Sequence, residues 1–263
     1  MSFMKKVITV SILASFGLAS VGLSSTLSRT YAANLDSAQS QPELNFNKDD
    51  MVITYQAKEI KDLNELERRA KAGISDLDQS EMSLAPKLNL NSVENQKSNE
   101  SEVVRTAQIL QTAERADGTK VNRVAITSFS SDGNKYSSSN DSTLGNKAYS
   151  TIYTDDWFDP RGVKYLTLVR VTGGWQLEGN NVSIASGTIT AGQAGPVYGG
   201  VGYSEAKTWN VSGTSFDYTL PTTWKPVAAK SVGSAAGTVI GVTTKVVYKR
   251  GNATWSHDLT NNM

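Results

Sequence analysis

The sequence predicts an all-β protein: an antiparallel β-sandwich, or a partly closed barrel, forming a C-terminal domain over residues 105–263. Three observations predict it. Apolar and polar residues alternate with a period of two in this region, as in 238–248, where Ile240, Val242 and Tyr248 share one face. Two-residue turn signals separate such segments. No long helical pattern follows residue 72, which disfavours a parallel βαβ architecture.

Residues 1–33 have the layout of a secretory signal peptide. Lys5 and Lys6 give a positive start, residues 7–23 are apolar and small, and Ala32 and Ala33 offer a cleavage site. An uncleaved membrane anchor is the alternative, because an apolar run of about 17 residues approaches the length that spans a bilayer. The serines and glycines within the run favour cleavage. We therefore expect a secreted, extracellular bacterial protein with no transmembrane span once the signal is removed.

Residues 34–104 form an acidic leader that we expect to be largely disordered. It has 8 basic and 14 acidic residues, a net charge of −6, whereas residues 105–263 have 15 and 11, a net charge of +4. One amphipathic helix is predicted over residues 59–72, where Ile60, Leu63 and Leu66 share a face. A single short helix is marginal alone, so it docks on the sandwich, binds another chain or frays. A spacer, a pro-segment and a self-association helix all remain open.

The sandwich is predicted to contain about nine strands. They cover residues 108–116, 120–129, 148–154, 165–171, 182–190, 197–203, 208–211, 216–220 and 238–248. The turn signals are Asp117-Gly118, Asp132-Gly133, Gly173-Gly174 and Gly251-Asn252. The glycine-rich stretch 187–202 predicts a long flexible loop or a bulged edge strand. Residues 231–244 predict a small-residue loop followed by a buried strand, with a membrane-inserting hairpin as the alternative.

The absence of cysteine and the single histidine exclude several function classes. Disulfide scaffolds, thiol nucleophiles, Fe–S clusters and Cys/His zinc sites are ruled out. His257 is expected to be a solvated residue near the chain end, and no Gly-x-Ser-x-Gly elbow supplies a nucleophile. We therefore predict no catalytic residue. Nucleic-acid binding is not expected, because the basic side chains form no stripe.

Aromatic side chains are the best candidates for ligand contacts. Trp157 and Trp224 lie in two proline-bounded segments that are predicted to be loops, so their rings are expected to be exposed. Tyr198 and Tyr203 lie in or beside the glycine-rich stretch and are the other predicted binding residues. By contrast, Trp175 and Trp209 are expected to lie in the core.

Three carboxylates, Asp155, Asp156 and Asp159, form a weak candidate calcium site, because calcium prefers oxygen ligands. Their spacing does not match the EF-hand loop. The alternative is a solvated loop in which Asp159 and Pro160 initiate a turn. No other cofactor is predicted.

No motif in the chain identifies a family. The composition favours a non-catalytic binding or interaction module at the cell envelope or host surface, with a cell-envelope glycan, a host surface component or another protein as its partner. Two alternatives remain. One is a β-type pore former. The other is a glycoside hydrolase, which needs only two carboxylates; its candidates are Asp155, Asp156, Asp159, Glu178 and Glu205.

Overall fold

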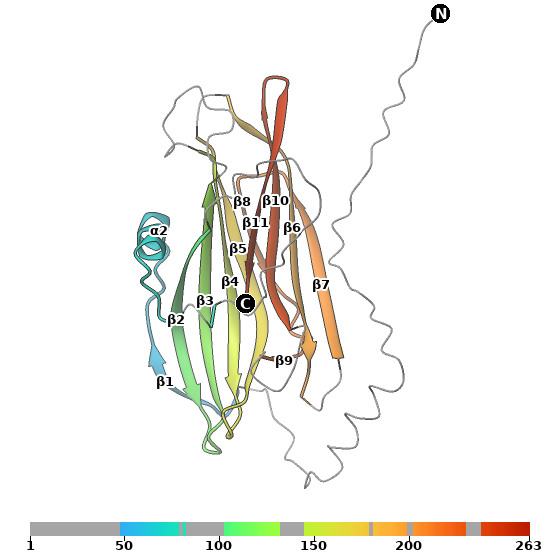
Figure 1. The fold of residues 1–263 in the computed structure, drawn as a ribbon. Helices are drawn as coiled ribbons and strands as arrows, with labels where there is room; N and C mark the ends of the chain where they lie inside the picture. The colour runs from blue at the N-terminus through green and yellow to red at the C-terminus, as the bar shows by residue number, and fades with distance from the viewer. Residues whose placement is uncertain are drawn as a thin grey trace, which may run out of the picture. The chain divides into compact units, whose positions relative to one another are not determined.

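The computed structural model describes residues 48–78, 81–82, 103–131, 145–178, 181–198, 202–229 and 238–263. Within these ranges the chain forms two antiparallel sheets and one short helix (Figure 1). The prediction of an all-β, sandwich-like fold is therefore confirmed. The predicted signal peptide, residues 1–33, lies outside the described residues. No helix in the described ranges has the length and apolar character needed to cross a membrane.

The larger sheet has seven strands in the order β1-β2-β3-β4-β5-β8, with β9 also paired to β5. Its strands are β1 (Val52–Gln56), β2 (Val104–Glu114), β3 (Lys120–Ser131), β4 (Lys147–Phe158), β5 (Lys164–Gln176), β8 (Ser215–Thr219) and β9 (Val227–Ala228). The smaller sheet has four strands in the order β11-β10-β6-β7. They are β6 (Ser183–Pro196), β7 (Gly202–Val211), β10 (Val239–Arg250) and β11 (Ala253–Asn262).

Most predicted strands correspond to observed ones, in β2 to β8 and in β10. The prediction of one strand over 197–203 is wrong, because β6 ends at Pro196, Val197 forms only an isolated bridge, and Gly202 and Tyr203 belong to β7. The sequence prediction also missed β1, β9 and β11. These three are short, exposed or rich in polar residues, so their apolar alternation is weak.

Two of the predicted turns are confirmed. Gly118 and Gly251 connect β2 to β3 and β10 to β11, with φ angles of +88° and +58° that favour glycine. The pair Asp132-Gly133 lies outside the described residues. The prediction of a turn at Gly173-Gly174 is wrong, because both glycines lie inside β5. A Cβ on Gly173 would come within 2.5 Å of the Phe216 ring, so glycine is needed there for close strand packing.

The glycine-rich stretch is also a strand. Residues up to Pro196 belong to β6, which lies between β10 and β7, so the prediction of a flexible loop or edge strand is wrong for this part. A Cβ on Gly187 would lie 2.9 Å from the Trp175 ring, which again indicates close packing. The buried strand predicted after residue 238 is confirmed as β10. Residues 230–237 lie outside the described residues.

The main hydrophobic core lies between the two sheets. Side chains alternate along each strand, so Ile126 on β3 and Ile152 on β4 point inward and meet Ile240 and Val246 on β10 in one cluster. Trp175 and Trp255 belong to the same core, and Trp209 packs at its edge, stacked on Tyr218 at 4.4 Å between ring centroids. The prediction that Trp175 lies in the core is confirmed, whereas Trp209 is half-buried.

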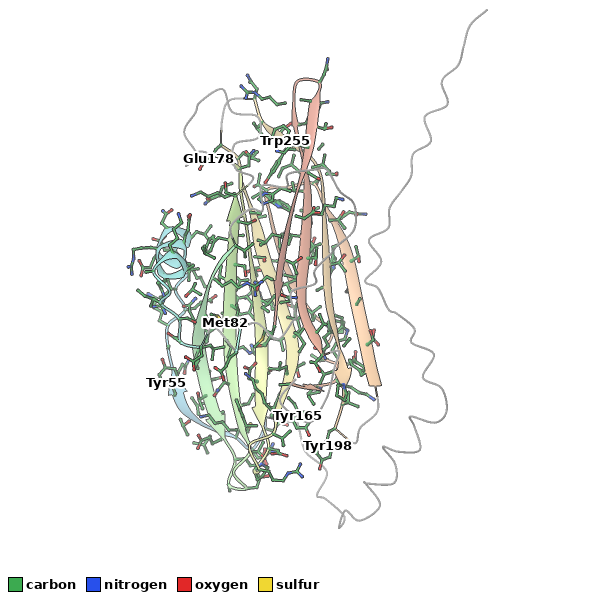
Figure 2. The ribbon with its side chains drawn as sticks, viewed as in Figure 1. Tyr55, Met82, Tyr165, Glu178, Tyr198 and Trp255 are labelled. Atoms are coloured by element: carbon green, nitrogen blue, oxygen red, sulfur yellow. The ribbon has the colours of Figure 1, made fainter. Side chains whose placement is uncertain are left out.

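The described part of the leader contacts the larger sheet at its edge and on its outer face, and it reaches the main core. β1 extends that sheet beside β2, and helix α2 (Leu63–Lys71) buries Leu66 and Ala70 against Phe129 (Figure 1). Asp62 caps the helix by accepting from two backbone N–H groups, so the helix begins four residues later than predicted. Met82 is 1 % exposed and belongs to the main core (Figure 2). The prediction of a largely disordered leader is therefore wrong for residues 48–78.

His257 is buried, although the sequence predicted a solvated residue. It lies on β11, which pairs with β10 along its length, and its Nε2 lies 2.8 Å from the Ser130 hydroxyl oxygen of β3. The side chain is 5 % exposed because it faces the larger sheet. Proximity to the chain end was the wrong criterion, because the Gly251 turn folds the last strand back into the sheet.

Candidate functional site

A cavity of about 610 Å³ lies on the outer face of the larger sheet, beside a bulge in β5. We call it the bulge cavity. Its walls come from β3, β4 and β5, from the segment after β8 and from the leader. The lining residues are Lys48, Arg123, Asp155, Trp157, Thr167, Leu168, Val169, Arg170, Thr219, Leu220, Pro221, Thr222, Trp224 and Pro226. The volume is within the range typical of small-molecule sites.

Strand alternation places two of these residues on the outer face of β4. Asp155 and Trp157 are two residues apart, so they share the face opposite to the one that carries Ile152. Arg123 of β3 lies directly across from Asp155, and Thr167 of β5 is the partner on the other side. Neighbouring strands thus bring a carboxylate, a guanidinium and a hydroxyl to one row of the sheet.

The bulge in β5 shapes the cavity. The β4–β5 register shifts so that Tyr153 pairs with Arg170 and Thr154 pairs with Leu168, which leaves Val169 as the extra residue. A bulge breaks strict alternation, so the consecutive residues 168–170 all line the cavity. The backbone groups released from the ladder are satisfied elsewhere: the Val169 carbonyl accepts from Leu220 N–H at 3.0 Å, and Leu168 N–H donates to Gln193 Oε1 at 2.8 Å.

The segment 220–226 forms one wall and is held by the smaller sheet. The Trp224 N–H donates to the Pro221 carbonyl at 3.1 Å, which closes a tight turn. Lys225 is the anchor of this segment, because its N–H donates to the Tyr203 hydroxyl at 3.1 Å and its carbonyl accepts from the Gln193 side chain. Gln193, which is 1 % exposed, therefore links the wall to the bulge through a single buried amide.

Asp155 is the centre of the charge arrangement. Lys48 Nζ lies 2.7 Å from one carboxylate oxygen, and Arg123 binds both oxygens at 2.5 and 3.1 Å. The Asp155 side chain is 8 % exposed, whereas those of Lys48 and Arg123 are 37 % and 36 % exposed. Burial lowers the pKa of Lys48, against the opposing attraction of Asp155. Because Lys48 and Arg123 share this one carboxylate, the site holds more positive charge than Asp155 neutralises.

Other polar groups complete the surroundings. Lys48 Nζ also lies 5.7 Å from the centre of the Trp157 ring, a cation–π arrangement. The Thr167 hydroxyl is buried and has no hydrogen-bond partner. An unpaired buried hydroxyl is costly and uncommon in folded proteins, so it marks a place where a hydrogen bond is missing.

A smaller cavity of about 290 Å³ adjoins the first at Arg170, which lines both. Here Tyr153 donates its hydroxyl proton to Glu59 at 2.6 Å, and Arg170 pairs with Asp217 and lies 5.2 Å from the centre of the Tyr153 ring. Burial, with the neighbouring Glu59 carboxylate, raises the pKa of Tyr153 to about 12. The cavity's carboxylates and its guanidinium all have partners within the protein.

The structure brings together two of the four predicted binding residues. Trp157 and Trp224 both line the bulge cavity, but they are only 3 % and 6 % exposed, so the prediction of exposed rings is wrong. Trp157 lies within β4 and not in a loop, and Trp224 is folded under the tight turn into the main core. At this exposure each tryptophan can offer a ligand only a small part of its ring.

The two predicted tyrosines lie elsewhere. Tyr198 is half-buried and packs edge-on against Tyr165, with ring centroids 5.9 Å apart (Figure 2). Tyr203 is half-buried at the edge of the main core and holds Lys225 in place. Neither residue lines the bulge cavity. Tyr203 therefore supports the wall of the cavity without forming it.

The three predicted calcium ligands do not converge. Asp155 faces outward on β4, while Asp156 faces inward and pairs with Lys164 at 2.9 Å. Asp159 accepts from the Arg161 and Val163 N–H groups and from the Arg161 guanidinium. Among the described residues no group of three metal-ligating side chains lies together. The correction follows from strand geometry, because adjacent residues of a strand point to opposite faces.

The sequence prediction missed the cations and the hydroxyl of the site. Lys48, Arg123 and Arg170 are far apart in the chain, and the pairing of β3, β4 and β5 brings the two arginines to the same face. A sequence signal existed for Arg123, because it lies in a predicted strand whose alternation places it on the face opposite to Val124. Nothing in the sequence predicted Lys48, because the leader was expected to be disordered.

Comparison of the chain with protein-family models, with curated proteins and with solved structures finds no match in any of the three. The conclusions about function therefore depend on the geometry of the bulge cavity alone.

Proposed function

We propose that this protein is a secreted, non-catalytic binding module that acts at a bacterial cell envelope or a host surface, with the bulge cavity as its ligand site. The observation that carries the proposal is the composition of this one cavity. It combines tryptophan and proline side chains with a cluster of charged and hydroxyl side chains, which is the usual make-up of a ligand pocket.

The same composition favours binding over catalysis. Asp155 is the one carboxylate among the lining residues, and two cations hold it in place. A glycoside hydrolase needs two carboxyl groups about 5 to 10 Å apart, one of which must carry a proton. The single carboxylate of the cavity does not provide such a pair.

Two neighbouring threonines provide a direct test. Thr222 and Thr223 are both exposed and lie in the same turn, but only Thr222 lines the cavity. Thr222→Trp should fill the entrance, whereas Thr223→Trp adds the same ring outside it. Retention of the protein on purified cell-wall polysaccharide and on fixed host cells would be measured for both variants.

We expect wild type and Thr223→Trp to be retained on one of these surfaces and Thr222→Trp to lose at least ten-fold in retention. Equal retention of the two variants would mean that the ligand binds elsewhere on the molecule. Failure of the wild-type protein to bind either surface would contradict the proposed function itself.

A further inference from the structure

The bulge cavity has an excess of positive charge at its floor. Three cationic side chains, Lys48, Arg123 and Arg170, line it together with a single carboxylate, Asp155. Arg170 is neutralised by Asp217 outside the cavity, but Lys48 and Arg123 share Asp155 between them. One positive charge is therefore left without a counterion among the side chains that form the floor.

Both cations retain unused hydrogen-bond donors. Arg123 uses Nε and Nη2 on Asp155, and Lys48 uses one of its three protons. Each side chain is about one-third exposed, so its remaining donors can reach a ligand. A carboxylate placed between the two would receive charge-assisted hydrogen bonds, which are the strongest kind available to side chains.

Threonine hydroxyls line the same cavity as this cationic pair. Thr167, Thr219 and Thr222 line the cavity, and the Thr167 hydroxyl is the buried group that has no partner. A threonine hydroxyl can both donate and accept a hydrogen bond, and a carboxylate can accept one. Both therefore pair well with ligand hydroxyls. The apolar part of the wall is formed by Pro221 and Pro226 together with the small accessible part of Trp224.

The position of the cavity argues against an extended peptide. Its floor is formed by strands of the larger sheet. Residues 167–169 of β5 are not paired with β8 or β9, but the Leu168 N–H donates to Gln193 and the Val169 carbonyl accepts from Leu220, so no free strand edge is left there. Peptides commonly bind by adding a strand to a free sheet edge, which these strands do not offer. Recognition here must come from side chains in a compact space of about 610 Å³, and this suits a short ring-shaped ligand better.

From these features we infer that the bulge cavity binds a carboxylate-bearing saccharide, with the carboxylate between Lys48 and Arg123 and the sugar hydroxyls toward the threonines. The inference rests on the proposed function and narrows its ligand to one chemical class. The carboxylate supplies the missing counterion, and a neutral sugar of the same size lacks it.

Isothermal titration of the full mature chain tests the inference with four probes: a trigalacturonate, a sialylated trisaccharide, a neutral galactose trisaccharide and a triglutamate peptide. We expect one of the two acidic saccharides to bind at least ten-fold more tightly than the neutral one. The first two probes distinguish a hexuronic acid from a sialic acid as the source of the carboxylate. Affinity for the acidic saccharide should fall as salt is raised, because the attraction is ionic.

Variants of the two cations test whether the ligand carboxylate lies between Lys48 and Arg123. Lys48→Gln should weaken binding of the acidic saccharide at least ten-fold, whereas Lys58→Gln, an exposed leader lysine that does not line the cavity, should leave it unchanged. Arg123→Lys keeps the positive charge but lacks the fork of donors with which arginine binds carboxylates at two points. We therefore expect an intermediate loss of affinity for the acidic saccharide. Circular dichroism confirms that each variant is folded.

Equal binding of acidic and neutral saccharides would overturn the inference and leave the proposed function intact, as would binding of triglutamate alone. An unchanged affinity in Lys48→Gln would also overturn it. If no probe binds while the wild-type protein is still retained on a surface, the saccharide class is wrong. Loss of both binding and retention contradicts the proposed function.

Discussion

Gly173 lies in β5 between β4 and β8, and replacing it with alanine measures how tightly these strands pack. The added Cβ would lie 2.5 Å from Cζ and 2.9 Å from Cε1 of Phe216, and it would also overlap the Tyr149 carbonyl oxygen. Ordinary carbon contacts are about 3.5–4.0 Å, so the ring and the β4 backbone must each move by about 1 Å. Overpacking of this kind costs about 1–3 kcal/mol of unfolding free energy.

Urea unfolding followed by tryptophan fluorescence checks this value. In a chain of this size, 1–3 kcal/mol corresponds to a fall of about 2–12 °C in the unfolding temperature. Gly202→Ala is the matched control, because Gly202 also lies in a strand but a Cβ there would meet nothing within 4 Å. Equal stability of the two variants would refute the view that Gly173 is required for strand packing.

Two further predictions concern stability. Burial raises the pKa of the Asp156 carboxyl. Between the ordinary pKa of about 4 and the raised one, the native protein therefore keeps a proton that the unfolded chain releases. The contribution of this proton to folding stability is greatest below about pH 4 and is lost as pH rises through the raised pKa. The stability of Asp156→Asn relative to wild type should therefore increase with pH from about 4 in urea unfolding, and a constant difference would contradict the assignment. Asp62→Ala removes the cap that accepts from Asn64 and Glu65 N–H at 2.9 and 3.3 Å, so α2 should lose about 0.5–2 kcal/mol of local stability, measured as faster amide hydrogen exchange in the helix; unchanged exchange would mean that packing alone holds it.

The turn glycines show how far the sequence predicts this fold. The pairs Asp117-Gly118 and Gly251-Asn252 are typical of two-residue hairpin turns, and both lie in turns. Gly173-Gly174 has the same local pattern, but both residues lie in a strand because β8 packs against them. Local sequence describes the backbone freedom of glycine, whereas the tertiary contact that uses this freedom is not visible in it.

The candidate site was predictable in part. Trp157, Trp224 and Asp155 were singled out by the sequence, and the fold brings all three to one cavity. Their exposure was not predictable, because the segment from Asp155 to Phe158 reads as a polar loop but continues β4 beside β3 and β5. The contribution of Lys48 depends on docking of the leader, which in turn depends on pairing with strands more than 50 residues away.

Gln193 couples the shape of the cavity to the packing of the two sheets. Its single side chain joins the bulge in β5 to the wall at Lys225, and it extends from β6 of the opposite sheet. Any sliding of one sheet over the other must either break these two hydrogen bonds or carry both walls along with it. The width of the cavity is therefore fixed by the relative position of the sheets, and a change in the packing between them alters the cavity without touching any residue that lines it.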